Sequence, residues 1–150
     1  MNLREANLND LEQLLALEQC LIESERPFDS SIKSEKTSYY DLENMILADN
    51  TYLIVIELEN EIVATGYVQI RHSKESFQHE QHAYLGLMFV MPEYRGQGIN
   101  KRIMDELMDW SQRKGVSDFY LEVYPHNESA IKAYEKAGFK PSLLEMKRCL

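Results

Sequence analysis

The stretch Met88-Phe-Val-Met-Pro-Glu-Tyr-Arg-Gly-Gln-Gly-Ile-Asn-Lys101 decides the fold, because it joins a strand, a glycine turn and a helix start. Residues 85–90 are almost all apolar and predict a buried strand. After the turn, apolar residues recur at the spacing of one helix face, at Ile99, Ile103 and Leu107. A helix start offers unpaired N–H groups and a positive dipole end, and glycines let an anion approach the backbone closely. The stretch therefore predicts a diphosphate site.

Two common phosphate-binding motifs do not match this stretch. A P-loop needs Gly-Lys-Ser/Thr at its end, whereas Gly98 is followed by Ile99 and Asn100. A dinucleotide fingerprint needs a third glycine three places after Gly98, where Lys101 stands. An ordinary glycine-assisted helix start is the alternative to a phosphate site.

The remaining pattern, Arg95-Gly-Gln-Gly-Ile-Asn100, resembles the Q/R-x-x-G-x-G/A signature of the GNAT superfamily of N-acetyltransferases. Arg95 matches the first position and Gly98 the fourth. Asn100 departs from the Gly or Ala of the sixth position, so its side chain either crowds the cofactor or points away from it. The resemblance implies that this turn binds the pyrophosphate of acetyl-coenzyme A.

A second motif supports the resemblance. The segment 121–139 is similar to the GNAT region after the cofactor helix, a strand followed by N-x-x-A-x-x-x-Y-x-x-x-G-F. The matching residues are Asn127, Ala130, Tyr134, Gly138 and Phe139. The two motifs stand in the family's order, and the element order of the whole chain fits the family.

The resemblance implies an acetyl-CoA site and no metal. The backbone of Met88, Phe89 and Val90 is expected to pair with the pantetheine arm, in a cleft where this strand parts from the one at Phe119. The expected pyrophosphate ligands are the N–H groups of Arg95, Gly96, Gln97, Gly98, Ile99, Asn100 and Lys101. Asn127 is expected to contact the cofactor arm; it also fits a plain helix cap.

Tyr134 matches the family's general acid and, by the same motif, lies near the cofactor. Attack by an amine expels a thiolate whose conjugate pKa is about 8.5, and a phenol with a pKa of about 10 can protonate it. The alternative is a core tyrosine on an amphipathic helix.

The general base is less clear from the residues. Many family members carry a glutamate five residues before the proline, and here that position is Leu87. Glu122 is a candidate base that accepts the proton of the amine directly or through water. The alternative is that Glu122 is an ordinary solvated carboxylate. His82 and Tyr84 are further candidates, and an acceptor that arrives neutral needs no base.

The implied function is transfer of an acetyl group from acetyl-CoA to a primary amine, by direct attack in a ternary complex. Glu25, Asp29, Tyr39 and Tyr40 are candidates for a pocket that takes a cationic amine; each also fits an ordinary polar loop or helix face. A non-catalytic acyl-CoA-binding module is the alternative function.

Composition and charge limit the partners and the cellular location that this protein is expected to have. A net charge of −9 argues against nucleic acid as a partner. No signal-peptide core or membrane-length apolar run is present, which favours a cytoplasmic protein without membrane attachment. Cys20 and Cys149 are expected to be buried free thiols. The spacing of His72, His79 and His82 fits no standard metal site, although a metal site at these histidines is an open alternative.

The periodicities predict an α/β fold in one domain over 1–150, a mixed sheet with helices on both faces. Asn7 begins a helix that ends at Pro27, with Leu11, Leu14, Leu15 and Ile22 inward and Glu18 interrupting them. Further helices are expected over 39–48, 96–114 and from Asn127 to Gly138. Strands are expected over 3–5, 51–58, 62–70, 82–90 and 119–124, with a last strand or pair in 143–149. Exposed strand edges near the C-terminus suggest a homodimer.

Overall fold

The computed structural model describes residues 1–150 and contains the predicted mixed sheet. Its strands lie in the order β1-β2-β3-β4-β5, with bounds β1 Asn2–Glu5, β2 Thr51–Leu58, β3 Glu61–His72, β4 Gln81–Val90 and β5 Phe119–Tyr120. β1 to β4 pair antiparallel, and β4 pairs with β5 parallel, as the helical crossover between them predicts. The β2–β3 hairpin turns at Glu59 and Asn60, which both have positive φ, as a type I′ turn requires.

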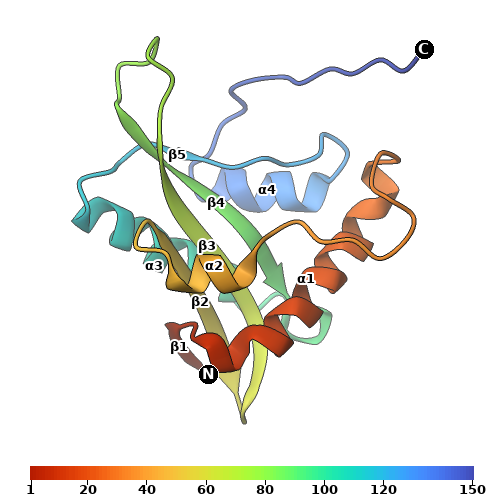
Figure 1. Cartoon of the computed structure of the whole chain (residues 1–150), viewed down its shortest axis with the longest axis vertical. Helices are drawn as coiled ribbons and strands as arrows, with labels where there is room; N and C mark the ends of the chain where they lie inside the picture. The colour runs from red at the N-terminus through yellow and green to blue at the C-terminus, as the bar shows by residue number, and fades with distance from the viewer.

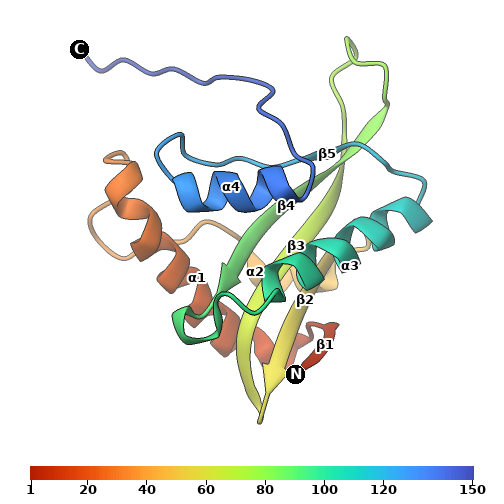
Figure 2. The ribbon, with the colours of Figure 1, turned by 180° about the vertical axis from the view of Figure 1, so that it is seen from behind.

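Helices cover both faces of this sheet (Figures 1 and 2). They are α1 Leu11–Glu25, α2 Leu42–Leu47, α3 Ile99–Arg113 and α4 Glu128–Lys136, with short 3-10 turns η1 Leu8–Asp10, η2 Arg26–Phe28 and η3 Pro92–Tyr94. One buried cluster joins α1 and α2 to the sheet, and the other joins α3 to the opposite face. β2 contributes to both clusters, since its alternate residues point to opposite faces, which explains its continuous aliphatic sequence. No helix is both long enough and apolar enough to cross a membrane.

A bulge interrupts the β3–β4 ladder between Thr65 and Tyr67. A Cβ at Gly66 would lie 2.7 Å from the Met88 sulfur and 2.8 Å from Ile103 Cγ2, so only glycine fits this approach. A glycine inside a strand is typical of such a bulge or close approach. On β4 the extra residue shifts the alternation, so that Leu85 faces α3 whereas Leu87 faces α1 and α2.

Several predicted elements are shorter in the structure. The helix expected from residue 39 begins at Leu42, where the side chain of Asp41 caps it, and the helix expected from Gly96 begins at Ile99. The strand predicted over 119–124 keeps a ladder at Phe119 and Tyr120 alone, because β4 and the chain part beyond them.

The predicted C-terminal strand is wrong. Residues 140–150 have no regular structure and extend beyond α4 (Figures 1 and 2), where Lys147 contacts Asp29 and Ser31. Leu143, Leu144 and Met146 are 89%, 74% and 84% exposed. A strand needs a partner for its backbone, and this segment pairs with neither edge of the sheet, which ends at β1 and β5.

Two side-chain expectations also fail. Cys20 and Cys149 are free, as predicted, but both are exposed. On α1, Leu15 is exposed, whereas Glu18 is fully buried. The buried stripe runs through Leu14, Leu17 and Ile22, so the inward face of α1 is rotated from the one expected.

Candidate active site

The glycine turn leaves the start of α3 open. Gly96 and Gly98 have φ of +77° and +76°, and a Cβ on either would meet no atom within 4 Å. No side chain caps α3, whereas the Asn7 and Asp10 pair forms a capping box at η1. The first helical bond after the turn runs from the Arg102 N–H to the Gly98 carbonyl at 3.1 Å. The Arg95 N–H already bonds to the Pro92 carbonyl at 3.3 Å, so its predicted role as a pyrophosphate donor is not supported. The N–H groups from Gly96 to Lys101 make no such bond and are free to hold an anion, and the turn fits a diphosphate.

The basic side chains of the turn make contacts within the chain. The Arg95 guanidinium bonds back to the Val90 carbonyl at 2.9 Å and lies over the Phe89 ring. Lys101 pairs with Asp105 at 2.6 Å. Ile99 is buried, Gln97 is exposed, and Asn100 lies in the first turn of α3.

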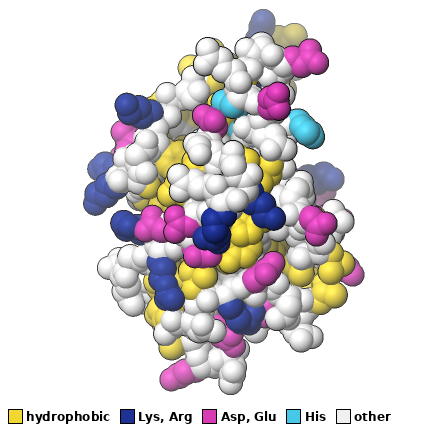
Figure 3. All heavy atoms as spheres, turned by 90° about the vertical axis from the view of Figure 1, so that its left-hand side faces the viewer, with side chains coloured by type: hydrophobic (Ala, Val, Ile, Leu, Met, Phe, Trp, Pro, Cys, Tyr) yellow, Lys and Arg dark blue, Asp and Glu magenta, His cyan; other side chains and the backbone are white.

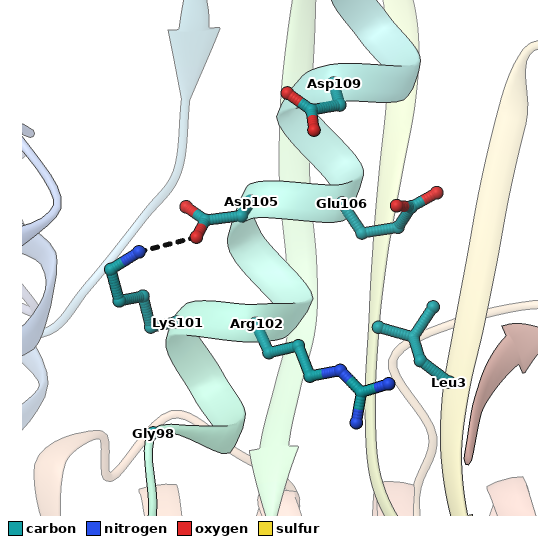
Figure 4. Close-up of a pocket in the computed structure, with 7 residues that line it drawn as sticks. All are labelled: Leu3, Gly98, Lys101, Arg102, Asp105, Glu106 and Asp109. Atoms are coloured by element: carbon teal, nitrogen blue, oxygen red, sulfur yellow. Dashed lines mark hydrogen bonds and ion pairs between the residues drawn. The ribbon is translucent and has the colours of Figure 1, made fainter.

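A shallow groove runs along the outer side of α3 (Figure 4). Its lining residues are Leu3, Gly98, Lys101, Arg102, Asp105, Glu106 and Asp109. Arg102 points toward Leu3, whereas Lys101 turns to Asp105 on the other side of the helix. Because three carboxylates line the groove beyond the turn, it does not extend an anion site.

β4 and the chain after β5 part next to the turn, as predicted. The parallel pairs end at Tyr84 with Tyr120, while β4 continues to Val90. On the other side of β4, Phe89 and Val90 keep their ladder with Thr65 and Ala64 of β3. The parted side of β4 lies at the expected pantetheine residues, whose role stays a prediction.

Leu87, which occupies the family's glutamate position, adopts a strained backbone. Its φ is +51°, in the left-handed region that few non-glycine residues adopt, and its side chain is buried. Its N–H bonds to the Tyr40 hydroxyl at 3.4 Å. The neighbouring Gly86 makes room for the Tyr67 ring, which lies 2.6 Å from where a Cβ would be. The bulge thus presents a backbone donor that the β-ladder does not use.

Tyr134 lies on α4 and is partly buried against the cluster under α3. Burial, and then the negative charge of Glu25, raises the pKa of Tyr134 to about 12, and no hydrogen bond within the chain contributes to the shift. Asn127 stands at the N-cap of α4 without making a side-chain capping bond. The cap predicted for Asn127 is right in position, but its side chain stays free of the helix backbone.

The candidates for the general base lie in two separate groups of residues. Glu122 is exposed, and its negative charge adds to burial in raising the pKa of Tyr84. His82 belongs to a different group, in which Ser73 Oγ lies 2.7 Å from His79 Nδ1 and 2.9 Å from His82 Nδ1. Burial lowers the pKa of His82. Histidines are visible toward one end of the molecule in Figure 3.

Glu18 is a positioning residue that sequence reasoning missed. Its carboxylate is fully buried and accepts the N–H groups of Tyr39 at 3.1 Å and Tyr40 at 2.9 Å. These bonds hold the segment that brings Tyr40 against Leu87. The sequence signal for this role was the position of Glu18, a charged residue that interrupts the apolar stripe of α1.

The residues predicted for the acceptor side come together. Tyr40 lies edge-on to Tyr39 and Tyr67, at centroid distances of 5.8 and 5.4 Å. Burial raises the pKa of Glu25, and the negative charge of Asp29 raises this pKa further. Asp29 accepts a 2.8 Å hydrogen bond from the Tyr124 hydroxyl, which the sequence did not single out.

Comparison with known proteins identifies the family. The model of the acetyltransferase (GNAT) family matches residues 17–139. The chain belongs to the GNAT acetyltransferase family. It is 28% identical to the probable N-acetyltransferase camello of Xenopus laevis over 75% of this chain and 49% of that protein. The chain spans less than half the length of the curated relatives it matches.

Solved structures share the GNAT fold over the full chain. A mutant of protein BH1408 from Bacillus halodurans superposes with a TM-score of 0.89 at 20% identity, covering 100% of this chain and 99% of that one. A predicted acetyltransferase from Clostridium acetobutylicum, solved with acetyl-CoA, has a TM-score of 0.77 at 18% identity, covering 97% and 95%. At these identities the likeness concerns the fold.

Proposed function

We propose that this GNAT protein transfers an acetyl group from acetyl-CoA to a primary amine, by direct attack in a ternary complex. The observation that carries the proposal is the uncapped start of α3 behind a glycine turn, directly beside the parting of β4 and β5. Structural neighbours crystallised with acetyl-CoA or CoA support the choice of cosubstrate.

In this proposal the diphosphate of acetyl-CoA binds the N–H groups from Gly96 to Lys101, and its pantetheine arm pairs with the backbone of residues 88–90. The side chain of Asn127, which α4 does not use for capping, contacts the arm. Acetyl-CoA supplies the thioester, whose carbonyl carbon is the electrophile.

The chain's own groups stabilise the charges that develop. The amine nitrogen bonds to the thioester carbon, and negative charge grows on the carbonyl oxygen. We assign the Leu87 N–H to that oxygen, because the bulge frees this N–H from the ladder. The oxygen then replaces the Tyr40 hydroxyl, which accepts from the Leu87 N–H at 3.4 Å in the free protein. When the C–S bond breaks, the Tyr134 hydroxyl donates its proton to the sulfur and later regains one from solvent.

The attacking amine must lose a proton, because an alkylammonium with a pKa of about 10.4 has no free electron pair. Glu122 is the proposed acceptor of that proton, through water. Its carboxylate is exposed and lies close enough to raise the pKa of Tyr84, on the face of the sheet that Tyr40 also occupies.

Two measurements test the proposal. A thermal-shift assay compares acetyl-CoA and CoA with ATP and NADH; a ligand at about a hundred times its Kd adds roughly 2.7 kcal/mol to the free energy of unfolding. An assay of free thiol release from acetyl-CoA then screens amines. Stabilisation by ATP or NADH instead would refute the cofactor assignment, and binding of acetyl-CoA without thiol release from any amine would favour the non-catalytic module.

A further inference from the structure

The Tyr124 hydroxyl donates a 2.8 Å hydrogen bond to Asp29, and two further carboxylates, those of Glu25 and Glu122, are near enough to act on its pKa. Glu25 ends α1, Asp29 follows η2, and Glu122 follows β5. After burial and the hydrogen bond to Asp29, the negative charges of all three raise the pKa of Tyr124. The Tyr124 ring also stacks on Phe28 at a centroid distance of 6.1 Å. Asp29 is therefore held in place by Tyr124, next to the carboxylates of Glu25 and Glu122.

A primary ammonium group already occupies this cluster. Lys147 Nζ, from the irregular C-terminal segment, lies 2.7 Å from Ser31 Oγ and 3.4 Å from Asp29 Oδ1. The Lys147 side chain is 67% exposed, and an exposed ion pair of this kind contributes little to stability. A competing cation can therefore displace it.

Other basic side chains nearby are engaged elsewhere. Arg26 bonds to Glu23 and to the Lys33 carbonyl. The Arg71 guanidinium lies 4.0 Å from the Tyr84 ring centroid and bonds to Gln69. Glu25 and Glu122 have no ion pair within the chain.

We propose that Asp29, with Ser31 and Tyr124, forms a subsite for a second ammonium group of the acceptor, so that the acceptors are small diamines or polyamines. This proposal rests on the proposed acetyl transfer. The reacting amine is neutral when it attacks, so it leaves the carboxylates uncompensated, whereas a second, remote ammonium pairs with them. Lys147 occupies the subsite in the free protein and leaves when the acceptor binds.

The test compares acceptors of equal length and different charge. The ratio of kcat/KM for 1,4-diaminobutane to that for 1-aminobutane is measured by thiol release, so that general losses of activity cancel. Asp29→Asn should lower this ratio about tenfold. Glu12→Gln, an equal loss of charge at the start of α1, should leave the ratio near that of the unsubstituted protein. An unchanged ratio in Asp29→Asn would overturn the subsite.

A second pair of variants tests the occupant. Lys147→Ala should raise the same ratio several-fold, because it removes the competing ammonium. Lys140→Ala, in the same exposed segment, should not. An equal effect of both variants, or none, would contradict the competition. Faster acetylation of a dilysine peptide than of any free diamine would overturn the assignment to small amines.

Failure of the acetyl transfer and failure of the ammonium subsite give different results. If no amine releases thiol although acetyl-CoA binds, the acetyl transfer fails, and the subsite is tested by calorimetric titration of 1,4-diaminobutane into the acetyl-CoA complex. Binding that Asp29→Asn abolishes would then support the subsite alone. Normal turnover of monoamines and diamines with equal kcat/KM would leave the transferase intact and refute the subsite.

Discussion

At the scale of the residue, the site depends on two groups that their surroundings hold in unusual states. Tyr134 keeps its proton because burial and Glu25 disfavour the phenolate. Leu87 holds a positive φ that costs of order 1–3 kcal/mol, and the packing of its buried side chain offsets this strain.

The first prediction concerns the general acid. Tyr134→Phe should lower kcat about 10²- to 10³-fold, because the thiolate then leaves without a positioned proton. The Kd for acetyl-CoA, measured by calorimetry, should change less than threefold. Tyr120→Phe removes the same hydroxyl from β5, where it bonds to His79, and should keep kcat within a fewfold. Full turnover in Tyr134→Phe would remove this residue from the mechanism.

The second prediction follows from the sign of the Tyr134 shift. A general acid acts while it is protonated, and a pKa raised to about 12 keeps the proton in place throughout the ordinary assay range. The plot of kcat against pH should therefore show no descending limb between pH 8 and about 10.5. A limb near pH 9–10 that Tyr134→Phe abolishes would show an unshifted phenol.

At the scale of the element, the open start of α3 separates cofactor binding from helix stability. Gly98 and Gly115 both have positive φ and open space at their Cβ positions, but they stand at opposite ends of α3. Alanine at either position pays a similar backbone cost of about 1–2 kcal/mol.

The third prediction uses this matched pair. Gly98→Ala should weaken acetyl-CoA about tenfold, because its Cβ and altered backbone intrude where the diphosphate approaches. Gly115→Ala should lose similar thermal stability and keep its acetyl-CoA affinity. Calorimetric titration and thermal melts measure the two quantities, and equal affinity in both variants would place the diphosphate elsewhere.

The fourth prediction concerns the link between β1 and α1. Asp10 is buried, accepts two 2.8 Å bonds from Arg4 and one from the Asn7 N–H, and the Arg4 bonds lower its pKa. Asp10→Asn should cost about 2 kcal/mol of unfolding free energy at pH 7. The stabilisation is present above the unfolded pKa of about 3.9 and is lost as pH falls through the lowered folded pKa. Urea melts should therefore show a smaller difference from the parent protein at pH 3 than at pH 7.

At the scale of the whole molecule, the C-terminal segment is the part that the fold leaves uncovered. Leu144, Met146 and Leu150 are all exposed. Exposed apolar side chains on an unpaired backbone favour pairing with another chain. We propose that a second copy of this chain covers the segment in a homodimer.

The fifth prediction tests this pairing by solution mass. Analytical ultracentrifugation should give a concentration-dependent dimer, and the double substitution Leu144→Glu and Met146→Glu should give a monomer. Lys132→Glu with Lys136→Glu, two exposed positions on α4, serves as a control of equal residue count that should stay dimeric. A parent protein that is monomeric at all concentrations would contradict the proposal.

Patterns within short windows of sequence determined most of the elements and the family. Apolar patterns of period 2 and period 3.6 predicted the bounds of β2, β3, β4 and α3 to within a few residues, because side-chain alternation and helical spacing are local properties. The glycine turn and the Asn127 to Phe139 motif likewise depend on residues within about 20 positions. The candidate cofactor and acid residues follow from these motifs alone.

Only the tertiary structure decided what distant segments do to one another. The carboxylate of Glu18 is buried because Tyr39 and Tyr40, about 20 positions away, bring backbone N–H groups to it. The strain at Leu87 arises from a bulge that needs β3 beside β4. The cluster around Tyr124 joins Asp29 and Lys147, more than a hundred positions apart. Such contacts depend on strand register and helix packing, which no local pattern of residues encodes.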